Sequence, residues 1–184
     1  YEADAPHKAF DTTFTNIVFG EGDAAARLCF VGEAPGEDED KTGRPFVGRA
    51  GQLLEKMITA MGLSRADVYI CNVLKTRPPG NRTPTTDEVV ACKPYLLEQL
   101  AIVRPEVIVG LGLSATHALL DTVDPMSRLR GRWWSVLDSR GSEIPFMPTY
   151  HPAFLLRSYT DENRAKVWSD LKMVMDRLGL PGKS

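Results

Sequence analysis

The sequence predicts an α/β protein, a three-layer α/β/α sandwich around a central, mostly parallel, four-stranded sheet. Four short apolar runs of strand length occur at 27–32, 68–73, 106–111 and 144–149, and helix-length segments separate several of them. Because parallel strands need crossover connections, this alternation favours a parallel sheet covered on both faces. The 184 residues, 43% hydrophobic and 25% charged, suit one domain, 1–184, with a substantial core.

Three helices can be located from apolar spacing and end signals. Residues 50–61 carry apolar side chains at helical intervals, and Gly62 ends the segment. A second helix is expected over 86–103, where the first residue is a suitable N-cap and Pro94 marks a kink or a break. An amphipathic helix is predicted over 160–178.

Composition limits the classes of function. The formal net charge of -2 argues against a protein that coats nucleic acid through bulk positive charge, so any such contact must be local. The sequence has no apolar run of about 20 residues and no secretory signal, and we expect a cytoplasmic protein that does not enter membranes. Cys29, Cys71 and Cys92 are odd in number and widely spaced, which excludes a disulfide framework and a four-cysteine metal site.

Residues 32–48 combine backbone freedom with concentrated charge and follow directly on the apolar run 28–31. Glycines, prolines and charged residues make this stretch a poor helix and a poor strand. A loop at the carboxyl end of a core strand is where open α/β sheets place their ligand sites. Polar side chains also follow the other expected strands, so one cleft should collect Glu33, Glu39, Asn72, Ser114 and His151.

Each of these residues also has an ordinary structural explanation. His151 precedes a proline and can be a loop histidine hydrogen-bonded to the backbone, and Asn72 can cap a turn. Ser114 can be the N-cap of the helix that follows it, although a helix N-terminus also suits a phosphate. The acidic run 37–40 can be solvated charge, the first turn of a helix or a weak divalent-cation site. Phe46 can be a core residue.

The motifs and their order resemble the uracil-DNA glycosylase superfamily, most closely its family four, the iron–sulfur type of bacteria and archaea. The resemblance extends over about 17–178, nearly the whole chain. Several independent segments match in order: Gly-Glu-Ala-Pro-Gly at 32–36, His-Pro-Ala-Phe-Leu-Leu-Arg at 151–157, and the shorter segments 43–48, 72–75 and 77–79.

This resemblance implies a DNA repair enzyme that flips uracil out of DNA and hydrolyses its N-glycosidic bond, leaving an abasic site. It implies that Gly32 and Ala34 contact the flipped base and that Phe46 stacks on the uracil ring. The amide of Asn72 would match O4 and N3–H of uracil and mismatch the reversed pattern of cytosine. His151 would donate a hydrogen bond to O2 of the departing base.

Two glutamates are candidates for orienting the attacking water. The best-known branch of the superfamily uses an aspartate of the first motif, where this chain has Ala34, so the carboxylate must come from elsewhere. We hypothesise that Glu33 orients the water and that Glu39 stands near C5 of the base, where it helps to exclude thymine. The opposite division of roles fits the sequence equally well.

The resemblance also indicates residues that contact the DNA strand. Leu155 or Leu156 would be the wedge that fills the gap left by the flipped nucleotide, or else a helix core residue, and Arg157 would reach a phosphate. Further candidates for contact with the DNA backbone are Lys75, Arg77, Pro78, Pro79, Ser114 and Arg130.

The sequence departs from family four at the cluster cysteines. Cys92 stands where one of four ligands is expected, but Thr76, Ala5 and Lys8 occupy the other three positions. A cluster normally held by four thiolates should not form, so we predict no iron–sulfur cluster, no other cofactor and no bound metal.

The leading interpretation is therefore a monofunctional uracil-DNA glycosylase. Its substrate would be uracil-containing DNA, single- or double-stranded, its product free uracil, and its state a monomer. The alternatives are a DNA-binding module that keeps the pocket with little or no turnover, a glycosylase for another deaminated base, and a metal-dependent phosphohydrolase that uses the acidic run.

Overall fold

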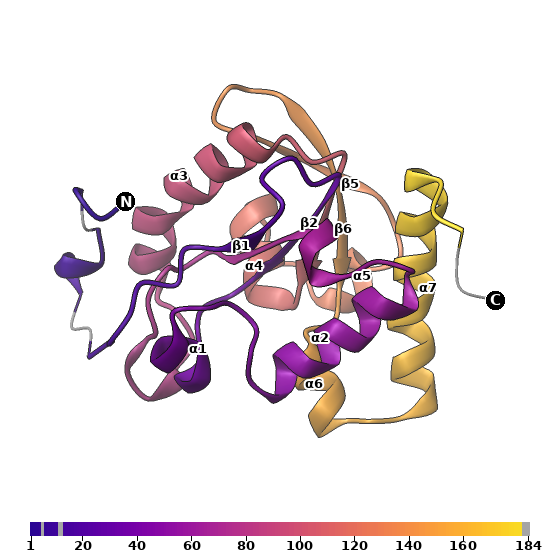
Figure 1. The fold of residues 1–184 in the computed structure, drawn as a ribbon, viewed down its shortest axis with the longest axis horizontal. Coiled ribbons are helices and arrows are strands. Elements are labelled where there is room, and N and C mark those ends of the chain that lie inside the picture. Colours follow the sequence, from indigo (N-terminus) through magenta and orange to yellow (C-terminus); the bar gives the residue numbers. More distant parts are fainter. Residues whose placement is uncertain (5, 11–12, 182–184) are drawn as a thin grey trace.

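A six-stranded sheet forms the centre of the computed structural model, which describes residues 1–4, 6–10 and 13–181 (Figure 1). The strand order is β1-β3-β2-β4-β6-β5. Strands β3, β2, β4 and β6 run parallel, and β1 and β5 add antiparallel edges. The strands are β1 (Glu21–Gly22), β2 (Leu28–Gly32), β3 (Tyr69–Asn72), β4 (Val107–Leu111), β5 (Trp134–Leu137) and β6 (Glu143–Thr149).

The predicted strand count of four was wrong, although the four predicted strands are present and form the parallel centre of the sheet. Their bounds differ from the predicted ones by one or two residues. The two missed strands lie at the edges, where only one face or neither is buried. β1 has two residues and β5 has one buried residue among four, so neither shows the continuous apolar run of a central strand.

Helices cover both faces of the sheet, which gives the three layers that the sequence predicts (Figure 1). Leu28 and Phe30 of β2 pack with α2, α6 and α7, while Cys29 and Val31 pack with α3 and α4. The α-helices are α1 (Glu37–Thr42), α2 (Arg49–Ala60), α3 (Thr86–Val103), α4 (Leu113–Leu120), α5 (Met126–Leu129), α6 (Pro152–Arg157) and α7 (Asp161–Leu178). Short 3-10 helices are η1 (Pro6–Ala9), η2 (Arg65–Asp67) and η3 (Pro79–Asn81).

The three predicted helices correspond to α2, α3 and α7. Helix α3 continues through Pro94 without a break, and its N-cap is Thr85 rather than the predicted Thr86. The N-cap of α4 is Gly112, so Ser114 lies inside that helix instead of capping it.

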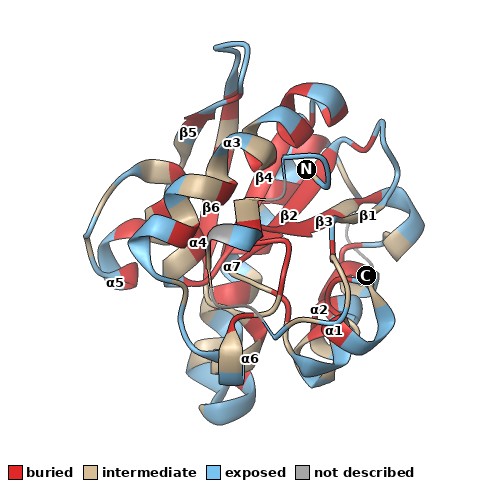
Figure 2. Cartoon of the chain, turned by 90° about the vertical axis from the view of Figure 1, so that its left-hand side faces the viewer, coloured by how far each residue is buried: buried red, intermediate tan, exposed pale blue. Residues whose placement is uncertain are grey.

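Figure 2 shows the sheet buried and the outer faces of the helices exposed. Over the described part of the chain, the helices are too short or too polar to cross a membrane.

Candidate active site

A cleft of about 940 Å³ opens at the carboxyl ends of the parallel strands. Loops after β2, β3, β4 and β6 line it, which is the edge where open α/β sheets bind ligands. The structure thus brings together residues that are far apart in the sequence. Among the predicted site residues, those that line the cleft are Glu33, Ala34, Glu39, Phe46, Asn72, Pro78, Ser114, His151 and Arg157.

Asn72, the last residue of β3, supplies an unused hydrogen-bond acceptor to the cleft. Its side chain is 1% exposed, and its Oδ1 has no hydrogen-bond partner within the described residues. A buried polar atom without a partner is costly, so Oδ1 calls for a ligand that donates an N–H or O–H. The amide does not act as a simple turn cap through this atom.

Gly32 leaves room for this arrangement at the end of β2. A Cβ on Gly32 would lie 2.4 Å from Asn72 Oδ1 and 2.5 Å from the ζ-carbon of Phe46. Any larger residue would therefore displace the amide or the ring. Gly32 shapes the space between the two side chains without lining the cleft itself.

Phe46 forms an aromatic wall of the cleft. Its side chain is 6% exposed, and its ring centroid lies 5.7 Å from that of the His151 imidazole. The residue adopts φ +52°, a left-handed conformation that is rare for a large side chain. The loop around it must supply the contacts that hold this backbone.

His151, the N-cap of α6, is set up as a neutral hydrogen-bond donor. Its Nδ1 accepts a hydrogen bond from Ala153 N at 3.0 Å, so the proton of the neutral ring resides on Nε2. Burial lowers the pKa of His151 to about 4, with Arg157 adding to the shift and Glu39 opposing it. The imidazole is therefore uncharged near neutral pH and has one N–H available for a ligand.

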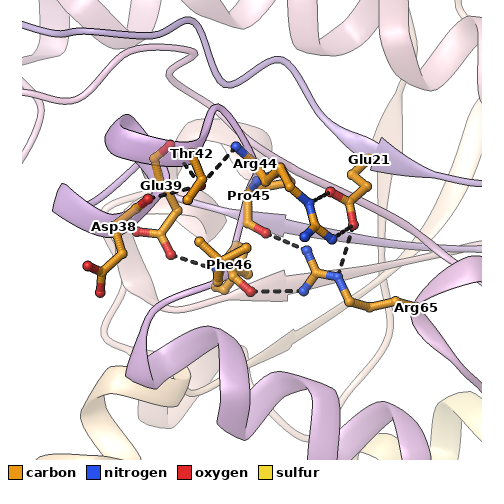
Figure 3. Close-up of polar contacts among 9 residues, drawn as sticks. Glu21, Asp38, Glu39, Thr42, Arg44, Pro45, Phe46 and Arg65 are labelled. Atoms are coloured by element: carbon orange, nitrogen blue, oxygen red, sulfur yellow. Dashed lines mark hydrogen bonds and ion pairs between the residues drawn. The ribbon is translucent and has the colours of Figure 1, made fainter.

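The two predicted glutamates have different surroundings. Glu39 Oε1 accepts hydrogen bonds from Val47 N and Gly48 N, both at 2.8 Å, and its Oε2 accepts one from Gly36 N at 3.1 Å. Figure 3 shows the Glu39 carboxylate turned toward the loop that carries Phe46. Glu33 lines the cleft, and its carboxylate makes no hydrogen bond or ion pair with any side chain or backbone group in the described ranges.

The acidic run 37–40 forms the first turn of α1, one of the explanations that the sequence allowed. Acidic residues there are favourable because they complement the helix dipole. Across residues 1–4, 6–10 and 13–181, no group of three or more His, Cys, Asp or Glu side chains is arranged to hold a metal ion.

The sequence comparisons agree with this geometry. The sequence model of the uracil DNA glycosylase superfamily matches residues 19–172. The chain belongs to this superfamily. A Type-4 uracil-DNA glycosylase of Thermotoga maritima is 48% identical over 164 residues, covering 86% of this chain and 81% of the relative. One of Archaeoglobus fulgidus is 45% identical over 171 residues, with 91% and 84% covered. A Type-5 uracil-DNA glycosylase of Pyrobaculum aerophilum is 41% identical over 147 residues, with 72% and 63% covered.

Within this superfamily member, Lys75 is not a DNA contact, so that prediction was wrong. Its side chain is fully buried, and its Nζ donates to the backbone carbonyl of Asn72 at 2.6 Å and to Oε1 of Gln99. Burial lowers the pKa of this lysine. Lys75 supports the strand end that carries Asn72 and has no path to a phosphate.

Two further DNA-contact predictions need correction. The side chain of Arg130 is 16% exposed, and its Nε and Nη2 bind the buried carboxylate of Asp170 at 3.1 and 2.7 Å, so the structure gives this arginine a partner inside the protein. Leu155 is 3% exposed and packs in the core, which excludes it as a wedge. Leu156, at 37% exposed, remains the candidate wedge.

The other predicted DNA contacts lie at or beside the cleft. Pro78, Ser114 and Arg157 line it, while Pro79 begins η3 at its border. Arg77 donates to Asn81 Oδ1 at 2.6 Å. The cleft also includes residues that the sequence analysis missed: Arg49, Asn81 and Met126. Of these three, only Asn81 could have been suspected from the sequence, because it closely follows the motif 77–79 in the loop after β3.

Protein stability is expected to fall as the pH is lowered from about 6.5 towards 4, the ordinary and the shifted pKa of His151. Between these values the unfolded chain binds a proton that the folded protein does not, so the free energy of unfolding decreases as the pH falls. Above this window the imidazole is neutral in both states and adds no pH dependence. Denaturant titrations across the window would measure the slope, which should be shallower in His151→Gln; equal slopes would contradict the assignment.

Proposed function

We propose that the protein removes uracil from DNA, hydrolysing the N-glycosidic bond of a flipped nucleotide and leaving free uracil and an abasic site. Membership of the superfamily supports this, as do the Type-4 relatives, which are 42–48% identical. The observation that carries the proposal is the buried Oδ1 of Asn72, which has no hydrogen-bond partner in the described part of the chain and lies beside the ring of Phe46. A flat ligand with an N–H at its edge would satisfy both.

These two groups distinguish uracil from cytosine, the base from which it arises by deamination. Its N3–H would donate to Asn72 Oδ1, and its O4 would accept from the amide nitrogen of the same side chain. Cytosine presents an acceptor at N3 and a donor at C4, so both contacts would be lost and the buried amide left unpaired. Stacking on Phe46 would add about 1–3 kcal/mol to the binding of the base.

Bond cleavage would use His151 and Glu33. As the bond from C1′ of the sugar to N1 of uracil breaks, its electron pair moves onto the base, and Nε2–H of His151 would stabilise the negative charge at O2. A water oriented by Glu33 would attack C1′ from the opposite side and pass its proton to the carboxylate. Glu39 would act through the loop that it binds rather than through the base.

Gly32→Ala is expected to lower the rate of uracil release about tenfold or more, because the new methyl group would push the Asn72 amide or the Phe46 ring out of place. Single-turnover kinetics on a uracil-containing oligonucleotide would measure the change, with the melting temperature as a check on folding. A fully active variant of unchanged melting temperature would show that the spacing between the ring and the amide is unimportant.

We also propose that the enzyme works without an iron–sulfur cluster. Of the four positions that family four uses, Cys92 keeps its cysteine, Thr76 and Lys8 are not ligands of this type, and Ala5 lies outside the described residues. The residues present therefore do not fit a cluster held by four thiolates.

Aromatic side chains surround Cys92 instead. Burial raises the pKa of Tyr1, with the neighbouring Cys92 adding to the shift, and the Tyr1 hydroxyl lies 3.2 Å from Nδ1 of His7. The Tyr1 ring stacks on His7 at 5.4 Å and meets Tyr95 edge-on at 5.1 Å. This packing would brace the segment that a cluster braces elsewhere. A purified protein that is brown, with broad visible absorption, would overturn the proposal.

The decisive experiment is alkaline-gel analysis of labelled oligonucleotides that carry one uracil, unpaired or opposite guanine or adenine. Strand scission at the uracil supports the proposal, and binding without scission would favour a module that has lost turnover. Scission only at hypoxanthine or xanthine would indicate another deaminated base, and loss of activity with a chelator would indicate metal chemistry. Monomeric state and cytoplasmic location stay predictions of the sequence.

A further inference from the structure

The loop 43–48, which carries Phe46, is held from outside the cleft by an arginine. We infer that Arg65 is a positioning residue for base stacking: it fixes the backbone of Phe46 so that the ring stands as a wall of the cleft. The inference rests on the proposed function, because the ring has a stacking role only if a base enters the cleft.

Arg65 binds the two backbone carbonyls at the bend of this loop. It begins η2, and its Nη1 donates to the carbonyl of Phe46 at 2.8 Å while its Nη2 donates to that of Pro45 (Figure 3). The side chain is 14% exposed and does not line the cleft. Arg65 therefore has no direct contact with a bound base and acts only through Phe46 and its neighbour.

The backbone of Phe46 needs such support. Its φ of +52° is unfavourable for a residue with a Cβ, so the free loop would prefer another conformation. Its carbonyl also packs against Gly51 of α2, where a Cβ would lie 1.9 Å from the carbonyl oxygen. Two hydrogen bonds from one charged, planar guanidinium hold the carbonyls at 45 and 46 in this direction, and such charge-assisted bonds are stronger than neutral ones.

The rest of the loop is held by two carboxylates. Glu21, on the edge strand β1, contacts Arg65 Nε at 3.2 Å and binds Arg44 through two hydrogen bonds of 2.6 and 2.7 Å. Glu39 binds the next two amides, those of Val47 and Gly48. Arg65 thus holds the backbone carbonyls at 45 and 46, and Glu39 holds the backbone amides at 47 and 48. Phe46 lies where these two sets of contacts meet.

Replacing Arg65 with Met should lower the single-turnover rate of uracil release about tenfold or more, since a misplaced binding group costs this much. Arg65→Lys keeps the positive charge but cannot donate to both carbonyls through a planar guanidinium, so its rate should fall less. It tests the inference even if Arg65→Met fails to fold. Arg27→Met is the matched control: Arg27 also binds a glutamate and a backbone carbonyl, those of Glu106 and Leu178, away from the cleft. That control should keep the wild-type rate.

A double-mutant cycle separates positioning from a general loss of stability. If Arg65 acts through the ring, Arg65→Met should cost little in a Phe46→Ala background. An equal cost in both backgrounds, or full activity of Arg65→Met, would overturn the inference.

Hydrogen exchange tests the same contact without any catalysis. The amides of Val47 and Gly48 should exchange faster in Arg65→Met, while those of β4 stay unchanged. Unchanged exchange in the loop would overturn the inference. If the wild type releases no uracil, the proposed function fails, and this measurement still decides whether Arg65 holds the loop.

Discussion

His151→Ala is expected to lower the single-turnover rate of uracil release by about 10²- to 10³-fold, the cost of removing one preorganised donor to a developing oxyanion. The Nδ1 contact with Ala153 directs the remaining proton to Nε2, and burial keeps the ring neutral. A neutral donor that is already in place needs no reorganisation as charge develops on the base. Rapid-quench measurement with enzyme in excess over a labelled uracil oligonucleotide would give the rate.

A second histidine provides a matched control for this variant. His117 lies on α4, outside the cleft, and its ring is likewise held by the backbone: its Nε2 donates to the carbonyl of Asp124 at 2.7 Å. His117→Ala should change the rate by no more than about twofold, as expected for a substitution away from the site. Comparable losses in both variants would point to folding rather than to the chemistry. A fully active His151→Ala would remove the proposed role.

The central strands could be predicted because burial on both faces leaves a direct trace in the sequence. Within the run 106–111, every residue after Glu106 is apolar, and the matching strand β4, Val107–Leu111, is buried at every position. An edge strand leaves no such trace: β1 is two residues long and becomes a strand only through its pairing with β3. Its importance for the site, through Glu21, was therefore invisible in the sequence.

The convergence of polar side chains could be predicted for a related reason. The carboxyl ends of parallel strands lie at the same edge of a sheet. Residues that follow these strands therefore come close together, however far apart they are in the sequence. The sequence does not reveal which charges find partners inside the protein. In the sequence, Lys75 and Arg130 resemble exposed basic residues. In the structure, Lys75 binds Gln99, 24 positions later, and Arg130 binds Asp170, 40 positions later.

Glu39 shows the same limit within the site itself. Its spacing in the motif placed it at the cleft, and the structure has it there. Its three backbone partners depend on how the loop folds back on α1, and this path is set by Arg65 and Gly51, which belong to other elements. A position in the chain predicts proximity, whereas the role of a carboxylate depends on which donors reach it.

Glu33→Gln is expected to lower the rate of uracil release by about 10²- to 10⁴-fold, the range that a general base contributes. Glu33 lines the cleft, and its carboxylate accepts no hydrogen bond from the protein's own donors in the described ranges, so both oxygens are available to a water. An amide of the same size cannot take the proton. Single-turnover rates at saturating DNA would isolate this step, and unchanged affinity for the DNA would show that the pocket is intact.

Glu39→Gln distinguishes this division of roles from the opposite one. A Gln oxygen can still accept from Val47 N and Gly48 N, although without the charge that strengthens these bonds. The loop should loosen, so we expect a lower melting temperature and a rate loss of about tenfold or less. Because the defect would lie in the position of Phe46, it should shrink in a Phe46→Ala background, whereas that of Glu33→Gln should not. A larger loss in Glu39→Gln than in Glu33→Gln would reverse the assignment and make Glu39 the residue that orients the water.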